Sequence, residues 1–352
     1  MRTVYVVLPD GVDDPLRPSG GNTYDRHLCD ELGAQGWAVR ERAVAGFWGT
    51  PDTVSFAALE ETLQQIPDDA VVLLDGLIAS TAPAVLVPQA SRLRLIVLVH
   101  MPLGHRPADD AAQQREREAL AAASATVTTS AWARRRLLEL YDLPAHRVRV
   151  AEPGVAPAGL VTGTEAGEAL LCVGAVISEK GHDLLLEALE SIAALSWSCT
   201  CVGRLDRDPD FVASLCRRSL DGAAGERVSF PGARTGPDLD RAYAAADLLV
   251  LASRAETYGM VVTEALSRGL PVVAAEVGGV GEALGEDASG ARPGLLVAPE
   301  DPGALAGALS AWLGDAELRA RLRRSAAQRR ESLPLWSTTA AAVAEVLAEA
   351  SA

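Results

Sequence analysis

Short apolar runs alternate with longer stretches of helical periodicity along the whole chain. This alternation is typical of βαβ units built around a parallel sheet, so the sequence predicts an α/β fold throughout. Six strands are expected in each half of the chain. They are Thr3–Leu8, Ala38–Ala43, Val71–Leu74, Leu95–Val99, Thr126–Thr128, Val148–Ala151, Ala169–Val173, Trp197–Val202, Val228–Pro231, Leu248–Leu251, Pro271–Ala274 and Gly294–Val297.

The length of 352 residues favours two domains, since a domain commonly has about 150. A Pro- and Gly-rich segment, Pro153–Gly159, is followed by small polar residues through Gly167, which is linker composition. We therefore expect one domain over residues 1–155, a linker over 156–167 and a second domain over 168–335. The last segment, 336–352, is expected to add a separate alanine-rich helix, Trp336–Ala350.

Composition excludes several classes of function. The chain has 32 basic and 47 acidic residues and a net charge of −15, which argues against a nucleic-acid partner. No apolar run approaches the roughly 18 residues that a membrane span requires, so no transmembrane segment is expected. The run Val4–Leu8 is too short for a secretory signal, and we expect a cytoplasmic protein.

The five cysteines do not form the pattern of a disulfide framework. Cys199 and Cys201 are expected on one face of a core strand. No Cys or His pair close to them in the sequence completes a zinc site, and we expect neither a metal nor a cofactor.

The segment around Glu256 carries the strongest indication of a ligand site. Glu256 lies in the loop at the carboxyl end of a predicted strand, where ligands bind in open parallel sheets, and a helix is expected from near Tyr258. Glu264 lies about two turns into that helix, so the two carboxylates are separated by up to roughly 12 Å and suit hydroxyl groups at either end of an elongated ligand. The free amides around Gly259 and Met260 suit a diphosphate between them.

Two other loops have phosphate-binding character. Lys180 is the only lysine of the chain, in a loop between a strand and a helix, where a compact ammonium suits phosphate. Near the N-terminus, Gly20, Gly21 and Asn22 lie in a loop that follows the first predicted strand and opens a helix. This loop is not G-x-G-x-x-G, which removes the main support for a nicotinamide-dependent dehydrogenase.

These motifs resemble those of the family-4 retaining glycosyltransferases with the GT-B fold. The resemblance rests on Glu256 and Glu264 with the following Ala-Leu-x-x-Gly-x-Pro-Val-Val, on Val173–Leu189, and on Ser19–Tyr24. It covers nearly the whole chain. It implies two doubly wound Rossmann-like domains that face each other across a cleft, with the nucleotide sugar on the C-terminal domain and the acceptor on the N-terminal one. It also implies that the terminal helix crosses back to the N-terminal domain.

The resemblance implies roles for single residues. Glu256 would contact the hydroxyls of the donor sugar, Glu264 the ribose, and Lys180 the diphosphate. The segment with Gly232 would lie at the nucleotide base, and Tyr258 would belong to the donor site. The family commonly has an arginine where this chain has Ala175, and we hypothesise that Arg204 supplies the missing guanidinium.

Three residues on the N-terminal half complete the expected site. His100 follows the fourth predicted strand and resembles the family's histidine that touches the donor sugar or the acceptor. Asp75 and His105 follow predicted strands at the same rim and are expected to meet the acceptor.

The expected activity is metal-independent transfer of a sugar from a nucleotide diphosphate donor, UDP favoured over GDP, to an acceptor hydroxyl with retention of configuration. Three alternatives stay open: a sugar phosphorylase, a nucleotide-sugar epimerase, and a non-catalytic nucleotide-sugar-binding protein. Detection of sugar transfer to a hydroxyl acceptor would distinguish a glycosyltransferase from these three alternatives.

Overall fold

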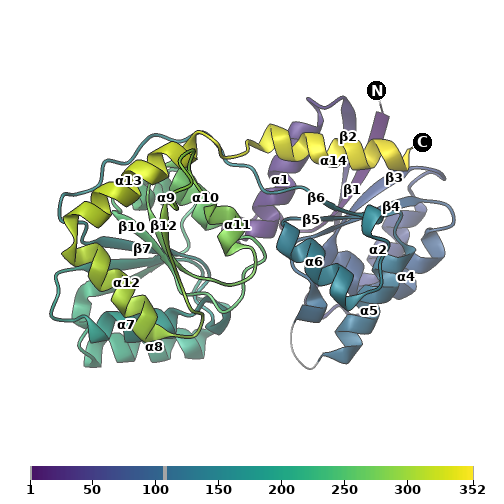
Figure 1. Cartoon of the computed structure of the whole chain (residues 1–352). Coiled ribbons are helices and arrows are strands. Elements are labelled where there is room, and N and C mark those ends of the chain that lie inside the picture. Colours follow the sequence, from purple (N-terminus) through teal and green to yellow (C-terminus); the bar gives the residue numbers. More distant parts are fainter. Residues whose placement is uncertain (1, 106–108, 352) are drawn as a thin grey trace. The chain divides into compact units, whose positions relative to one another are not determined.

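The computed structural model describes residues 2–105 and 109–351, with the side chain of His105 outside that description. The chain divides into two compact units, Met1–Gly154 with Pro334–Ala352, and Val155–Leu333. Each unit contains one six-stranded parallel sheet between helices (Figure 1). The α/β prediction is confirmed, and every expected strand is present with ends within one residue of the predicted ones.

The first unit contains six strands in the order β2-β1-β3-β4-β5-β6, so the order reverses between β1 and β3. Its elements are β1 (Arg2–Pro9), α1 (Gly20–Leu32), β2 (Trp37–Val44), α2 (Thr53–Gln64), β3 (Val71–Asp75), α3 (Gly76–Thr81), α4 (Pro83–Gln89), β4 (Arg94–Val99), the short 3-10 turn η1 (Leu103–His105), α5 (Asp110–Ala122), β5 (Ala125–Thr128), α6 (Ala131–Leu140), the 3-10 turn η2 (Ala145–Arg147), β6 (Val148–Val150) and α14 (Trp336–Ala350).

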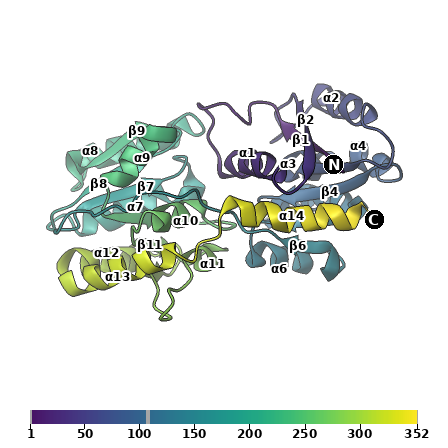
Figure 2. The same cartoon turned by 90° about the horizontal axis from the view of Figure 1, so that it is seen from above.

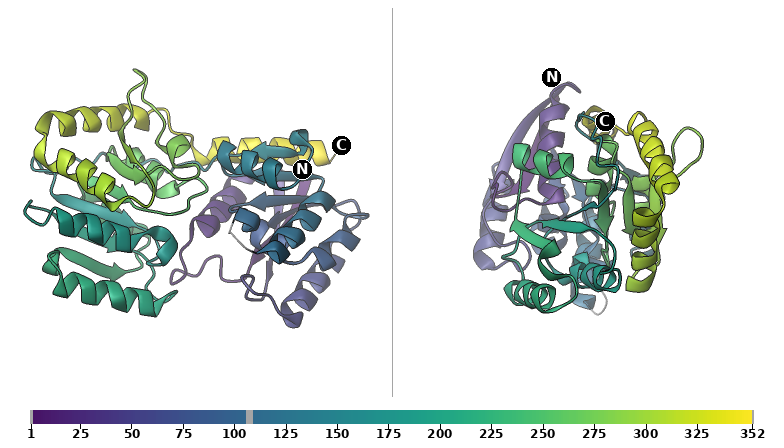
Figure 3. Two further views of the ribbon diagram at one scale, coloured as in Figure 1. Left: turned by 60° about the horizontal axis from the view of Figure 1, so that its bottom comes forward. Right: turned by 90° about the vertical axis from the view of Figure 1, so that its left-hand side faces the viewer.

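The second unit has the strand order β12-β11-β10-β7-β8-β9, which reverses between β10 and β7. Its elements are β7 (Ala169–Val173), the 3-10 turn η3 (Ser178–Lys180), α7 (His182–Ser191), β8 (Ser198–Val202), α8 (Pro209–Asp221), the 3-10 turn η4 (Gly225–Arg227), β9 (Val228–Gly232), α9 (Gly236–Ala244), β10 (Leu248–Leu251), α10 (Met260–Ser267), β11 (Val272–Ala275), α11 (Val280–Leu284), β12 (Gly294–Val297), α12 (Pro302–Gly314) and α13 (Ala316–Arg330). Helices α12 and α13 lie next to each other in this unit (Figure 3).

The central strands consist almost wholly of apolar residues because helices cover both faces of each sheet. In the second unit, α7, α8 and α12 pack on one face around Leu186 and Trp312, and α9, α10 and α11 pack on the other around Tyr243 and Leu266. These cores hold the strand ends in register, which fixes where the loops at the carboxyl edge begin.

Helix α14 packs on the first unit, alongside α1 (Figure 2). Its first residue, Trp336, is buried, stacks on His27 with ring centroids 4.6 Å apart, and meets the edge of Tyr24 at 5.5 Å. The hydroxyl of Thr339 donates a hydrogen bond to the backbone oxygen of Glu152. The terminal helix therefore completes the core of the N-terminal unit.

Candidate active site

The reversal of strand order between β7 and β10 brings two of the predicted site residues together. Lys180 follows β7 and Glu256 follows β10, so both lie at the carboxyl edge where a crevice opens in such sheets. Lys180 Nζ lies 2.5 Å from Glu256 Oε1, and the hydroxyl of Ser253 donates to the same oxygen at 2.8 Å. The Glu256 side chain is only 10% exposed, so its carboxylate is held in one place.

Arg254 connects the two loops more firmly, and the sequence analysis did not single it out. Its guanidinium pairs with both carboxylate oxygens of Asp183 at 2.9 and 2.8 Å and donates to the backbone oxygen of Ser178 at 2.6 Å. Its backbone N–H donates to the oxygen of Glu179. Arg254 thus fixes the turn that carries Lys180. The sequence could have indicated Arg254, since it precedes Glu256 by two residues in the loop after the same strand.

Glu264 lies on α10, facing Tyr243 of α9. The Tyr243 hydroxyl donates to Glu264 Oε2 at 2.8 Å, and the guanidinium of Arg268 lies 4.5 Å from the centre of the Tyr243 ring. Burial raises the pKa of Glu264, while the Tyr243 hydrogen bond and the Arg268 charge act in the opposite direction. The second carboxylate is therefore presented by a rigid aromatic support. Sequence reasoning missed that support because 21 residues separate Tyr243 from Glu264.

Helix α10 begins at Met260, two residues later than the sequence predicts. Gly259 precedes it with φ of 94°, a left-handed conformation that glycine adopts without strain, and no side chain caps the helix. The Tyr258 side chain is buried.

Arg204 and Gly232 lie on neighbouring parts of the sheet edge, after β8 and at the end of β9. The guanidinium of Arg204 forms two hydrogen bonds with the carboxylate of Asp206, at 2.9 and 2.8 Å. We hypothesise that Arg204 replaces the arginine missing at Ala175. In that case its guanidinium would bind Asp206 and the diphosphate together, or leave Asp206 for the diphosphate.

In the first unit, His100 lies between two buried carboxylates. Its Nε2 donates to Asp25 Oδ1 at 2.8 Å and lies 3.6 Å from Asp75 Oδ2, and the His100 side chain is 19% exposed. Burial opposes the charge on His100, but Asp25 and Asp75 outweigh it and raise its pKa to about 9. Burial and the nearby Asp25 raise the pKa of Asp75 to about 7. The two carboxylates therefore favour the imidazolium form of His100.

The glycine-rich loop lies against this histidine. A Cβ on Gly21 would meet His100 Cδ2 at 3.2 Å, so the small residue leaves room for the ring. Gly20 begins α1, whose N-cap is Ser19, and the Asn22 side chain donates to the backbone oxygen of Arg17. The structure thus brings the glycine-rich loop and His100 together.

Asp25 is the residue of this cluster that sequence reasoning missed. It lies on α1, 75 residues before His100, and is 2% exposed. Its Oδ2 is buried without a hydrogen-bond partner among the described residues. A buried aspartate on an otherwise apolar helix face was the available signal, because such a carboxylate requires a partner.

Asp75 has a second task that the sequence analysis did not anticipate. Its carboxylate accepts hydrogen bonds from the backbone N–H groups of Leu77 and Ile78 and so caps α3. His105 ends η1, and its side chain lies outside the described residues. The backbone of this turn is held by buried Glu116, which accepts from the N–H groups of Leu103 and Gly104 at 3.0 Å each.

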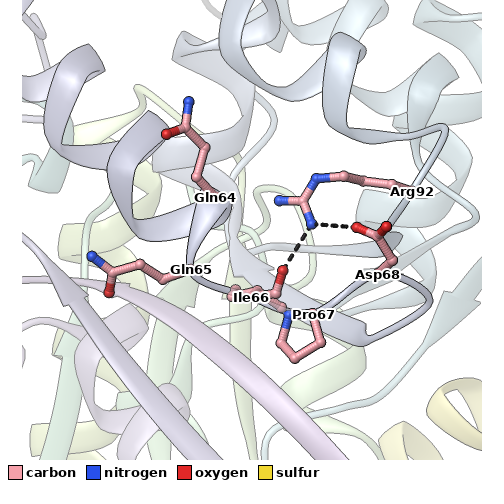
Figure 4. Close-up of a pocket in the computed structure, with 6 residues that line it drawn as sticks. All are labelled: Gln64, Gln65, Ile66, Pro67, Asp68 and Arg92. Atoms are coloured by element: carbon pink, nitrogen blue, oxygen red, sulfur yellow. Dashed lines mark hydrogen bonds and ion pairs between the residues drawn. The ribbon is translucent and has the colours of Figure 1, made fainter.

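A hollow of about 480 Å³ lies elsewhere on the first unit, as Figure 4 shows. It is lined by Gln64, Gln65, Ile66, Pro67, Asp68 and Arg92. Arg92 crosses it to the backbone oxygen of Ile66 at 2.7 Å and to Asp68 at 3.0 Å. These residues precede β3 and β4, so the hollow lies at the amino ends of the strands, opposite the edge with Asp75 and His100.

Comparison with known proteins finds a matching family model and similar proteins. Residues 164–329 match the family model "Glycosyl transferases group 1". A D-inositol 3-phosphate glycosyltransferase of Salinispora arenicola is 31% identical over 290 residues, which are 75% of this chain and 63% of that protein. The protein of the same name from Kineococcus radiotolerans is 33% identical over 257 residues, 66% of this chain and 58% of that protein. The chain thus spans less than two thirds of these relatives' length.

Solved structures show the same fold. A sucrose-phosphate synthase from Thermosynechococcus elongatus superimposes with a TM-score of 0.80 at 20% identity, covering 99% of both chains. Anabaena Alr3699/HepE in complex with UDP-glucose gives a TM-score of 0.76 at 18% identity, covering 99% of this chain and 100% of that one. In the part of the chain that the structure describes, no helix is both long and apolar enough to cross a membrane. The chain therefore has the GT-B fold of these structures, and its residues 164–329 match the glycosyl transferases group 1 model.

Proposed function

We propose that this chain is a retaining glycosyltransferase that moves a sugar from a nucleotide diphosphate donor to an acceptor hydroxyl without a catalytic metal. The observation that carries the proposal is the Lys180–Glu256 pair at the reversal of strand order, with the start of α10 beside it. UDP-sugars are the favoured donors, since the fold matches a protein solved with UDP-glucose. We expect the reaction to take place in the cytoplasm.

Lys180 has the chemistry that the leaving group needs. When the bond between the anomeric carbon and the diphosphate breaks, negative charge develops on the phosphate oxygens. An ammonium fixed beforehand stabilises that charge without reorganising during the reaction. Glu256 and the loop held by Arg254 keep Nζ in place before the donor arrives. The backbone N–H groups at the start of α10 add a positive end of a helix dipole.

Retention follows if the acceptor attacks on the side from which the diphosphate leaves. The acceptor oxygen then bonds to the anomeric carbon, and its proton passes to a diphosphate oxygen. Glu256 would hold the hydroxyls of the transferred sugar and Glu264 the ribose hydroxyls. The positions of the two carboxylates support these assignments. Glu256 lies in the loop after a strand, and Glu264 lies on a helix beside Tyr243.

The N-terminal unit would bind the acceptor through Asp75, His100 and the turn that contains His105. The imidazolium of His100 donates hydrogen bonds and cannot accept a proton, so it would orient hydroxyl groups and not act as a base. Asp25 would position His100, because it fixes the ring nitrogen at 2.8 Å.

Nucleotide binding gives the first test. The purified chain is heated with UDP, GDP, dTDP or ADP, each with magnesium or with EDTA. A nucleotide at about one hundred times its Kd should stabilise the fold by roughly 2.7 kcal/mol. We expect UDP to give the largest shift and EDTA to leave it unchanged. Loss of the shift in EDTA would contradict metal independence.

Transfer itself needs a second assay. UDP-sugars are supplied with myo-inositol, D-inositol 3-phosphate or other polyols, and both UDP release and a new glycoside are measured. D-inositol 3-phosphate is included because the relatives' name specifies it. Glycoside formed with retained configuration supports the proposal. Sugar 1-phosphate formed from added phosphate, an epimerised donor, or binding without turnover would each replace it by one of the alternative functions.

A further inference from the structure

A thiol and imidazole cluster lies in the core of the second unit, apart from the groups assigned to sugar transfer. Cys172 of β7, Cys201 of β8 and His182 at the start of α7 are each 1% exposed. Their ligand atoms all lie within 4.8 Å of one another, and Cys172 Sγ is 3.7 Å from His182 Nε2. The parallel register places Cys172 directly opposite Cys201.

A further sulfur contacts one member of this triad, and its side chain would have to rotate toward the other two to share an ion with them. Cys199 lies two residues before Cys201, on the same face of β8, and the two Sγ atoms are 4.0 Å apart. The sequence analysis places Cys199 and Cys201 on one face correctly. It considered only partners close in the sequence, whereas Cys172 and His182 are distant in sequence and come close through the pairing of β7 with β8 and the packing of α7.

The spacing of the triad suits a tetrahedral zinc ion. Zn–S bonds of about 2.3 Å and Zn–N bonds of about 2.0 Å place neighbouring ligand atoms roughly 3.5–3.8 Å apart in a tetrahedron. The observed separations approach these values, so small side-chain rotations would complete the geometry. Sulfur and imidazole ligands are the set that zinc prefers over the harder divalent cations.

Burying these polar side chains without a bound ion costs free energy of folding. His182 is fully enclosed, its Nδ1 is without a hydrogen-bond partner among the described residues, and its Nε2 has only a thiol nearby. An apolar core offers such a ring little compensation for lost water. Three thiolates, a neutral imidazole and Zn²⁺ sum to a single negative charge, which a buried site tolerates better than separate thiolates.

We propose that Cys172, His182 and Cys201 form a structural zinc site, with Cys199 as the fourth ligand. The site would tie the start of α7 to the sheet. Since His182 follows Lys180 by two residues, the metal would also brace the turn that carries the only lysine. This inference does not depend on the activity proposed above, and it revises the sequence-based expectation that the chain binds no metal.

The test measures metal directly in the full chain. Protein produced with zinc in the medium is dialysed and its metal content determined by mass spectrometry. Replacement of zinc by Co²⁺ should give sulfur-to-cobalt charge-transfer bands and the intense visible bands of a tetrahedral site. Prolonged chelation should lower the melting temperature by about 5 °C or more.

Matched variants localise the site. C201A should lose zinc and the cobalt bands, and C199A should weaken both. C29A removes another buried thiol, in the first unit, and should keep the metal. If C201A does not fold, the wild-type spectrum still decides. Folded wild-type protein without stoichiometric zinc, and without tetrahedral cobalt bands after refolding with Co²⁺, would overturn the proposal.

Discussion

At the scale of single residues, the two glutamates of the second unit are assigned to opposite ends of one ligand. Glu256 is paired with Lys180 and Ser253, whereas Glu264 is held by Tyr243. Glu256→Gln should therefore lower kcat by about 10²–10³ and leave UDP binding nearly unchanged. Glu264→Gln should weaken UDP binding roughly tenfold through a lost charged hydrogen bond. Calorimetry with UDP and initial rates check both, and equal losses of UDP affinity would refute the division.

A second prediction concerns Asp25 and the charge on His100. Asp25→Asn removes the nearer carboxylate, so the pKa of His100 should fall from about 9 toward its ordinary 6.5. Because folding raises the pKa of His100, its protonation stabilises the folded state. This stabilisation is fully present below about pH 6.5 and is lost as the pH rises through about 9. NMR titration of the His100 ring measures the pKa.

The activity of the same variant separates positioning from structure. Asp25→Asn should move the alkaline limb of kcat to lower pH, and Asp25→Glu should restore part of it. His27→Gln is the matched control, since His27 lies on the same helix and does not touch His100. An unchanged pH profile in Asp25→Asn would contradict a positioning role.

Arg204 provides the third prediction at this scale. If it shares the charge of the diphosphate in place of the arginine absent at Ala175, Arg204→Ala should raise the KM for the donor several-fold. Asp206→Ala removes the carboxylate that competes with a diphosphate for the guanidinium and should lower the same KM. An unchanged KM in Arg204→Ala would end the hypothesis.

At the scale of elements, the turn between η3 and α7 depends on Gly181. Its φ is 66°, and a Cβ there would lie 1.9 Å from the backbone oxygen of Ala252. Gly225, with φ of 58°, has open space around the same position and is the matched control. Gly225→Ala should cost about 1–2 kcal/mol, and Gly181→Ala roughly 3 kcal/mol. Denaturant unfolding measures both, and equal costs would show that the Ala252 contact is unimportant.

The sequence predicted elements far better than their contacts. Strand ends were accurate because apolar runs stop at turn residues on both sides, as at Leu248–Leu251. The start of α10 was placed two residues early, since the left-handed Gly259 gives no hydrophobic signal. Partners from other elements, such as Asp25 for His100 and Tyr243 for Glu264, were missed because only tertiary packing brings them close.

At the scale of the whole molecule, α14 joins the last residues of the chain to the first unit. Trp336→Ala should destabilise this unit by about 3–5 kcal/mol, because it empties a site between Tyr24 and His27. Trp336→Phe should cost less. Hydrogen exchange followed by mass spectrometry should show faster exchange in α1 and unchanged exchange in α7. Loss of protection in α7 alone would contradict the assignment of α14 to the first unit.

This connection also sets an order for folding during synthesis. Residues 2–154 leave the ribosome first, but the face of α1 that receives Trp336 stays uncovered until the whole second unit has been translated. The second unit is continuous in sequence and can fold earlier, although it is made later. The N-terminal unit therefore keeps an apolar face exposed longest during synthesis, and a premature stop before Trp336 would leave that face uncovered.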